Sequence, residues 1–391
     1  MSATTQPSTQ PSTQPSTRPA PRRLLLRRLP LLVGVAVVAL LAVLPQLAIT
    51  VPGVLPGPTY TPGTLQLLAL CMVFAALALS YNLLLGTGGL LSFGHALYFG
   101  AGAYGLGILL ENTELSLWPA IAVTLLLAGA VAVLTGSISL RVTGIPFAMV
   151  TLAFAQAGSV LVRRNPDGLT GGEEGLRLRT DHVPAALVGV VHTRNLYWFA
   201  LVVVVLAYLL VLWVDRSRVG HVAAAARENE ARIRSLGLQP YAAKLFVFVV
   251  GGLIASLAGV AYLLLQSGTV PRSVGADLTI TVLVMVVLGG VGSRWGAIVG
   301  GVTYTLLNQR LTLLAGSEGV DGLPPVLRVP LSEPMFLLGA LFILVVLFLP
   351  GGVAGTAATL AGRRRPRAGE AALEAADSPA EPRDGVLEPT R

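Results

Sequence analysis

Long apolar runs separated by short polar stretches dominate this chain between residues 31 and 349. About ten of them approach the ~20 residues that a helix needs to cross ~30 Å of hydrocarbon. The runs are continuous and do not alternate between apolar and polar residues, so they predict helices and not barrel strands. The predicted segments cover residues 31–48, 65–85, 93–110, 118–140, 144–162, 196–214, 244–265, 278–291, 295–314 and 335–349. The predicted fold is therefore all-α, a polytopic integral membrane helical bundle.

Three of these segments have a weaker pattern than the others. Residues 93–110, 144–162 and 278–291 are glycine-rich or short. Each of them is expected to be either a full crossing or a broken or re-entrant helix.

The distribution of arginine predicts the orientation of the bundle. Arginines flank the first and last runs, at Arg22, Arg23, Arg27 and Arg28 and again at residues 363–365. An even number of crossings places both termini on one side, which the positive-inside rule makes cytoplasmic. Residues 215–243 then lie inside. Residues 163–195 lie outside, although they hold five arginines beside four acidic residues, which partly conflicts with the rule. We interpret the first run as an uncleaved crossing, because it is long and has no clear cleavage site.

Composition separates the membrane part from two tails. The chain has 54% apolar and 12% charged residues and a mean hydropathy of +0.75, far from a soluble domain. Residues 1–23, with a Thr/Gln/Pro/Ser repeat, and residues 354–391 are predicted to be disordered. Residues 24–353 form the predicted transmembrane domain. The net charge of +8 sits at the edges of apolar runs, which argues for a lipid bilayer and against nucleic acid. The single cysteine, Cys71, excludes an internal disulfide.

One predicted cytoplasmic segment, residues 215–243, is charged and is called the charged loop below. Eight charged side chains fall within residues 215–234. Residues 222–236 contain good helix formers, Gly237 suits a left-handed cap, and Pro240 suits the first turn of the next crossing. The pattern predicts a short interfacial helix. Pairs at i, i+4, Glu228 with Arg232 and Glu230 with Arg234, are equally expected of an ordinary surface helix.

Five stretches of the chain together resemble one known family. They are residues 227–237 (RENEARIRSLG), 81–96 (YNLLLG and GGLLSFGHA), 144–156 (GIPFAMVTLAFAQ), 169–176 (LTGG and GL) and 288–296 (LGGVGSRWG). In this order they are similar to the permeases of hydrophobic amino acid ABC importers, especially those for branched-chain amino acids. Urea and short amide permeases are close relatives.

The resemblance implies a coupling helix in the charged loop that docks into a groove of an ATPase subunit. The matching positions are Arg227, Glu228, Glu230, Ala231 and Gly237. Compared with the strict motif of the family, Arg232 replaces the second alanine, and Glu230 lies seven residues before Gly237 and not six. The register of the docking contacts therefore differs from the strict motif.

The resemblance also implies a complex. Its partners would be a second homologous permease subunit, two ABC ATPase subunits and an extracytoplasmic substrate-binding protein. The external loops around Gly171 and Gly172 are a docking surface for the binding protein in this scheme. Movement of residues 219–237 would rock the helices between outward-open and inward-open states.

Polar residues within the crossings are candidates for a translocation path. They are Asn82, Ser92, His95, Thr151 and Gln156. An ionisable group in a membrane is costly and often functional, but a neutral His95 bonded to a neighbouring helix is an equal alternative. Gly251, Ala255 and Gly259 repeat at four-residue spacing, which predicts close helix packing or, alternatively, a hinge. Residues 100–105 match Gly-x-Gly-x-x-Gly, but they lie in an apolar segment and not between a strand and a helix.

The sequence points away from intrinsic catalysis and from an internal energy source. Its only lysine, Lys244, follows Ala243, so a Walker A loop is missing. We expect no cofactor, no metal cluster and no catalytic triad. The crossings lack a chain of buried acidic or lysine residues, which favours a separate ATPase. A stand-alone secondary carrier or channel, or a non-transporting scaffold, remains the alternative of another class.

Overall fold

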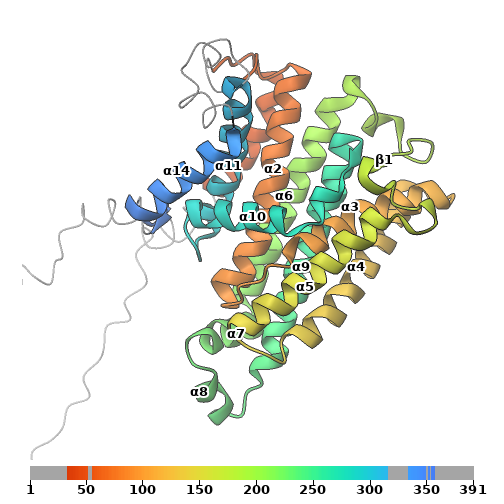
Figure 1. The fold of residues 1–391 in the computed structure, drawn as a ribbon. Coiled ribbons are helices and arrows are strands. Elements are labelled where there is room, and N and C mark those ends of the chain that lie inside the picture. The colour runs from red at the N-terminus through yellow and green to blue at the C-terminus, as the bar shows by residue number, and fades with distance from the viewer. Residues whose placement is uncertain (1–32, 52–54, 316–332, 349–350, 353, 357–391) are drawn as a thin grey trace, which may run out of the picture.

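The computed structural model describes residues 33–51, 55–315, 333–348, 351–352 and 354–356 (Figure 1). The predicted tail 1–23 and residues 357–391 lie outside this part. Residues 354–356, at the start of the predicted C-terminal tail, are helical.

Each of the ten predicted segments corresponds to a helix. The first described helix covers Val33–Gln46 and ends in the 3-10 turn η1 (Leu44–Gln46). The other long helices are α2 (Pro62–Asn82), α3 (His95–Asn112), α4 (Leu117–Ser139), α5 (Ile145–Arg164), α6 (Thr193–Arg216), α9 (Pro240–Gln266), α10 (Ala276–Gly289), α11 (Arg294–Ala315) and α14 (Pro334–Phe348). The charged loop contains two short helices, α7 (Arg218–Glu228) and α8 (Glu230–Ser235), where the sequence predicts one.

The described helices make this chain a polytopic helical membrane protein. Five are long and apolar enough to cross a bilayer: α2 with its extension to Thr87, α4, α5, α6 and α9. The weak segment 144–162 is therefore a full-length helix, α5. Helices α10 and α11 pass the same test only together, and a 120° bend separates them. The expected count of about ten crossings stays a prediction.

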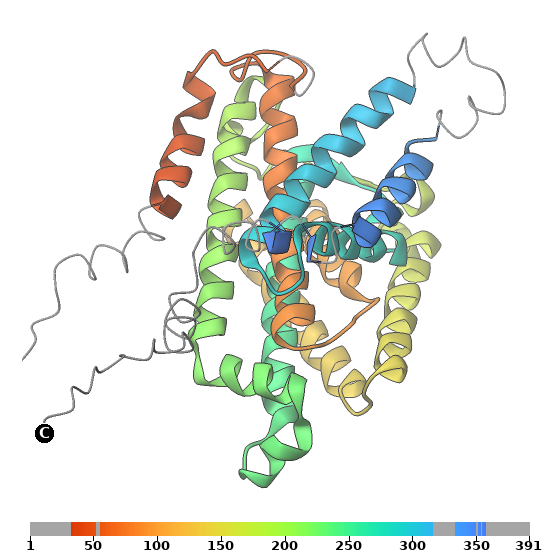
Figure 2. The same cartoon turned by 90° about the vertical axis from the view of Figure 1, so that its left-hand side faces the viewer.

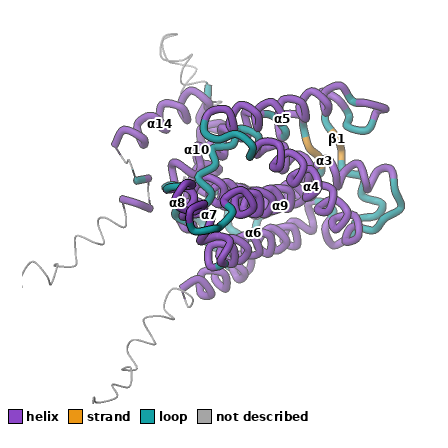
Figure 3. The backbone as a smooth tube through the Cα atoms, turned by 90° about the horizontal axis from the view of Figure 1, so that it is seen from below, coloured by secondary structure: helices purple, strands orange, loops and turns teal. Residues whose placement is uncertain are grey.

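Helices α2 and α9 form the centre of the bundle. In their most apolar windows 83% and 72% of residues are buried, against 33% in α4 and α5. Helix α9 packs on α3, α4 and α2, and α2 packs in turn on α6 and α11. Figure 3 shows α9 between α4 and α6, and Figure 2 shows the Val33–Gln46 helix standing beside α6 at the edge. The bundle is thus built around two buried helices with less buried helices outside them.

Small residues bring the backbones of α3 and α9 into contact. A Cβ atom on Gly102 would overlap the carbonyl oxygen of Ser256, and one on Gly259 would overlap that of Phe99. The Ser256 hydroxyl donates a hydrogen bond to the Tyr98 carbonyl oxygen at 2.8 Å. Because lipid supplies no hydrophobic force between helices, such close packing and interhelical hydrogen bonding hold them together. The prediction of tight packing around Gly251 and Gly259 is confirmed.

Two chain segments depart from simple up-and-down crossings. Helix α10 runs across the bundle at about its mid-height (Figures 1 and 2). At the end away from α7 and α8, strands β1 (Leu176–Arg177) and β2 (Gly268–Thr269) pair antiparallel. The connections there contain the 3-10 turns η3 (Pro166–Gly168), η4 (Gly172–Glu174), η5 (Ala185–Leu187), η6 (Val190–His192) and η7 (Pro271–Ser273).

The α3–α9 contact predicts a large effect of one added side chain. Gly102→Leu should destabilise the fold by more than about 3 kcal/mol, because the obstacle is backbone and cannot move aside as a side chain does. The measurement is the thermal unfolding midpoint of the detergent-purified protein. Gly339→Leu is the control, since a Cβ on Gly339 meets nothing within 4 Å. Equal midpoints for the two variants would contradict the packing described here.

Candidate functional site

The first feature of the site is a helix break between α2 and α3. Helix α2 continues as a π turn, η2 (Leu83–Thr87), and residues 88–94 then leave the helical conformation. Gly89 adopts φ +64°, which favours glycine. We call residues 83–94 the first break. The third predicted segment, residues 93–110, corresponds to the continuous helix α3, which begins directly after this break, and whether it crosses the membrane fully stays a prediction.

Side chains from three helices pair with the open backbone of the first break and of the first turn of α3. The Tyr81 hydroxyl donates to the Ser92 carbonyl oxygen at 2.9 Å. The backbone N–H of Phe93 donates to Thr151 Oγ1 at 3.1 Å, and that of Ala96 donates to Thr279 Oγ1 at 2.9 Å. In lipid, an unpaired backbone group costs several kcal/mol, so a non-helical segment persists only when protein groups pair with it. Tyr81, Thr151 and Thr279 supply that pairing.

His95 begins α3 directly after the first break and is fully buried. Its Nε2 lies 2.7 Å from Ser80 Oγ, and the Ser80 hydroxyl donates to the Leu77 carbonyl oxygen at 2.6 Å. Since the serine hydrogen is engaged, we assign the hydrogen of the imidazole to Nε2. The rings of Tyr81 and Tyr98 meet the imidazole edge-on. His95 therefore bonds to a neighbouring helix, while its Nδ1 has no partner among the described atoms.

The second break, residues 290–293, separates α10 from α11. Gly290 and Gly292 adopt φ values of +108° and +84°. A Cβ atom on Gly289 would overlap the Gly296 carbonyl oxygen. The end of α10 and the first turn of α11 are therefore in backbone contact. The glycines of the stretch 288–296 thus permit a sharp reversal within the bundle.

Asn82 joins the two breaks. Its Oδ1 accepts a hydrogen bond from the backbone N–H of Gly292 at 2.8 Å. A Cβ on Gly86 would lie 2.9 Å from the Gly292 Cα atom, so the two backbones nearly touch. One amide side chain, 3% exposed, therefore fixes the relative position of two irregular segments.

The charged loop contacts the first break and the start of α11 through two residues. Arg227, at the end of α7, donates from Nη1 to the Gly86 carbonyl oxygen. Asp215, at the end of α6, accepts from Thr87 Oγ1 at 2.8 Å and from Arg294 Nη1 at 3.1 Å. Sequence reasoning placed Arg227 in the docking motif but did not pair Asp215 with Arg294. Asp215 and Arg294 are 79 positions apart in the sequence, so no local pattern could predict that they pair.

The rest of the charged loop is locally ordered and turned outward. Asn229 ends α7 and caps α8 by accepting from the Arg232 N–H at 3.0 Å, which explains the two helices. Glu230 pairs with Lys244 of α9 and with Arg234, 3.3 Å away, as the i, i+4 spacing predicted. Gly237 adopts φ +76° as expected of a left-handed cap.

An outward surface at the tip of the loop is available for a partner. Glu228, Ala231 and Gly237 are exposed. Leu236 and Leu238 are 68% and 44% exposed, which is unusual for large apolar side chains in a charged segment. Their position beside Gly237 was the signal that sequence reasoning missed.

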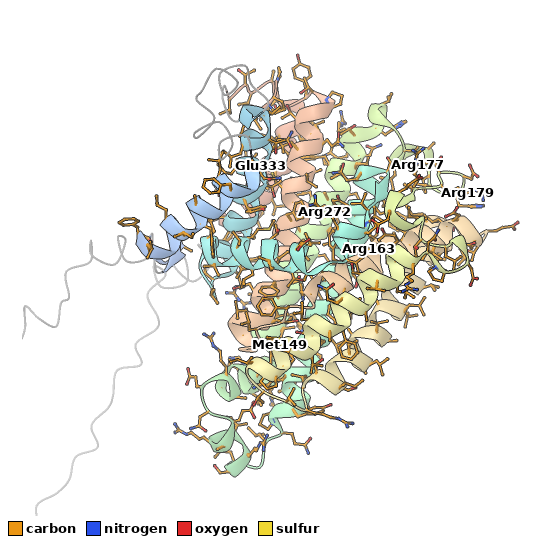
Figure 4. All side chains as sticks on the ribbon, in the orientation of Figure 1. Met149, Arg163, Arg177, Arg179, Arg272 and Glu333 are labelled. Carbon is orange, nitrogen blue, oxygen red and sulfur yellow. The ribbon has the colours of Figure 1, made fainter. Side chains whose placement is uncertain are left out.

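The candidate path residues divide into two groups. Asn82, Ser92, His95 and Thr151 are buried around the first break, as described above. Gln156 lies further along α5 and is exposed, apart from the other four. Figure 4 shows Met149 and Arg163 on the same side of α5, with Arg272 of η7 beside Arg163.

A rigid loop lies at the opposite end from the charged loop. Asn165 adopts φ 48°, and its Oδ1 accepts from the N–H groups of Thr170 and Gly171 at 2.8 and 3.0 Å. A Cβ on Gly175 would overlap the Thr269 carbonyl oxygen, which ties the loop to β2. Glu173 and Glu174 are exposed, and Arg177 and Arg179 extend outward nearby (Figure 4).

Among the described residues, no group of three or more His, Cys, Asp or Glu side chains is arranged to hold a metal ion. Cys71 is buried within α2, consistent with packing.

Removing the link between the breaks gives a direct test of this geometry. Asn82→Ala removes the part-buried hydrogen bond to the Gly292 N–H, which should cost about 0.5–1.5 kcal/mol of stability. Asn112→Ala is the matched control, because Asn112 is exposed and bonds only within its own helix. Thermal unfolding in detergent measures both. A loss no larger for Asn82→Ala than for Asn112→Ala would contradict the assigned hydrogen bond.

Comparison with known proteins adds an independent finding. Residues 63–346 match the family described as branched-chain amino acid transport system / permease component. The chain is 27% identical over 317 residues to the high-affinity branched-chain amino acid transport system permease protein LivM of Escherichia coli (strain K12), covering 74% of this chain and 70% of LivM. LivM of Salmonella typhimurium gives the same identity and coverage. A shorter match, 28% identical over 30% of this chain and 33% of the relative, is to the autoinducer 2 import system permease protein LsrC of Yersinia enterocolitica.

Proposed function

Because this chain belongs to the family of branched-chain amino acid transport system permease components, we propose that it carries branched-chain amino acids as one subunit of an ATP-driven importer. The chain is the permease subunit of an amino acid importer. In our proposal it lies in the cytoplasmic membrane, with the charged loop inside. A second homologous permease subunit, two ATPase subunits and an extracytoplasmic binding protein complete the complex.

A single observation carries the proposed mechanism: the charged loop is bonded to the first break and to the first residue of α11, which directly follows the second break. Arg227 holds the first break at Gly86, and Asp215 holds the first break at Thr87 and α11 at Arg294. A displacement of α7 and α8 is therefore transmitted directly to the first break and to the start of α11, next to the second break. Because packed helices shift between discrete arrangements, such a tie can switch a transport path.

The exposed tip of the loop is the proposed ATPase docking surface. Glu228, Ala231 and Gly237 match the family motif, and Leu236 and Leu238 add exposed apolar area beside them. A hydrophobic centre with a charged rim is typical of protein interfaces. At the opposite end, the rigid loop around Gly171 and Gly172, with Arg163 and Arg272 near it, is the proposed contact of the binding protein.

Reconstitution tests the function directly. Proteoliposomes that hold this chain with its partner permease, ATPases and binding protein should accumulate leucine only when ATP is inside. The chain by itself should move none, even under a proton or sodium gradient. Uptake driven by such a gradient alone would favour the secondary carrier or channel. Excess urea should leave leucine uptake unchanged, and competition by urea would shift the substrate towards short amides.

The Asp215–Arg294 pair tests the mechanism. Asp215→Asn should lower the leucine taken up per ATP hydrolysed by about 2- to 30-fold, the range of energetic coupling that single residues carry. The two side chains are 23% and 34% exposed, so part of their attraction is screened. ATP hydrolysis itself should continue, because the docking surface is intact.

The internal control is a double-mutant cycle. Either change alone removes the Asp215–Arg294 ion pair. The double variant Asp215→Asn with Arg294→Gln should therefore lower the leucine taken up per ATP hydrolysed no further than the more severe single variant does. Additive losses would show that the two residues act independently, against the proposed tie.

A further inference from the structure

A cavity of about 410 Å³ lies where the charged loop meets the first break. Its walls are α8, the first turns of α9, the connection of α4 to α5 (residues 140–144), the start of α5 (residues 145–149), and residues 89–93 of the first break. This volume lies within the range of small-molecule sites, about 300–1,000 Å³. The mechanism described above does not use the cavity.

Charged groups of both signs occupy one part of the lining. Glu230 and Lys244 are only 27% and 12% exposed at their side chains, and they form an ion pair there. Arg234 and Arg141 also line the cavity, and Arg141 has no ion-pair partner among the described residues. Three cations therefore face one carboxylate. An incoming carboxylate would find Arg141 without an ion-pair partner, and an ammonium group would share the Glu230 carboxylate with Lys244 and Arg234.

The remainder of the lining is apolar. Leu91 of the first break is 40% exposed, and Met149 of α5 is 57% exposed. Phe93 and Leu90 complete this side. Burial of a small aliphatic side chain against these groups would stabilise a complex by roughly 1.5–3 kcal/mol.

We propose that this cavity binds a branched-chain amino acid from the cytoplasmic side. Its carboxylate would bind Arg141, its ammonium group would bind Glu230, and its side chain would pack on Leu91 and Met149. An inorganic anion would leave the apolar wall unused. An anionic phospholipid would place its phosphate beside Glu230 and far exceeds the cavity. The zwitterion with an apolar side chain is the chemistry that uses every part of the lining.

Occupancy of this site would slow import. Glu230 and Arg234 of α8 form part of the cavity wall, together with α9 and residues 140–149. The cavity therefore requires α8 in its present position. A ligand that binds one arrangement stabilises it against all others. Cytoplasmic amino acid would thus hold the charged loop in its present position and oppose the movement that drives the next turnover. The slowing of import rests on the proposed function, whereas the binding of an amino acid in the cavity does not.

Binding is tested by titration of the assembled importer, purified without ATP and without its binding protein, with L-leucine, leucinamide and 4-methylpentanoate. Leucinamide lacks the carboxylate and 4-methylpentanoate lacks the ammonium group. Each should bind about tenfold or more weakly than L-leucine, because each loses one charge-assisted contact. Arg141→Gln should weaken L-leucine binding by a similar factor. Arg218→Gln, an exposed arginine in the charged loop outside the cavity, should leave it unchanged.

Inhibition is tested in proteoliposomes with ATP inside and increasing L-leucine preloaded inside, by the initial uptake rate of labelled leucine. The rate of the wild type should fall with internal leucine, and that of Arg141→Gln should require about tenfold more. Normal uptake with no leucine binding would overturn this inference and leave the proposed function standing. Binding displaced by phosphatidylglycerol vesicles but insensitive to Arg141→Gln would assign the site to lipid and overturn it as well. Absence of any ATP-driven uptake would instead reject the proposed function.

Discussion

Pairing of backbone polar groups inside a membrane is the constraint on which the rest of this structure depends. Two helices are interrupted within the bundle, and each interruption opens N–H and C=O groups that lipid cannot satisfy. The protein meets this demand with side chains: Thr151 and Thr279 at the first break, and Asn82 across to the second. These hydrogen bonds are therefore the reason that irregular backbone can persist in the interior.

The same demand explains why the charged loop is connected to the bundle. The carbonyl oxygen of Gly86, freed where α2 turns into the π segment, is satisfied by Arg227 of α7. Arg294, the first residue of α11, is neutralised by Asp215. The hydrogen bond from Arg227 that satisfies the Gly86 carbonyl oxygen is thus also a contact between the charged loop and the interior of the bundle.

Glycine permits this arrangement because it lets backbones approach one another. At the second break Gly289 meets Gly296, and on α3 Gly102 meets Ser256, at distances that no side chain tolerates. In a water-soluble protein, a glycine at such a position would forgo the stabilisation that a buried apolar side chain provides. In lipid, where helices gain little from hiding apolar surface, close contact and interhelical hydrogen bonds are the available source of stability.

The sequence by itself determined the helical membrane class, the position of the charged loop, the caps at Gly237 and Pro240, and the family, because these follow from local periodicity and from motifs of adjacent residues. It also located Asn82, Ser92, His95 and Thr151, since polar residues stand out in apolar runs. Only the tertiary structure decided that α10 reverses into α11, that Gln156 is separate from the other polar residues, and that Asp215 meets Arg294. These features depend on which distant backbones touch, and hydrophobic periodicity carries no record of contacts between residues 79 positions apart.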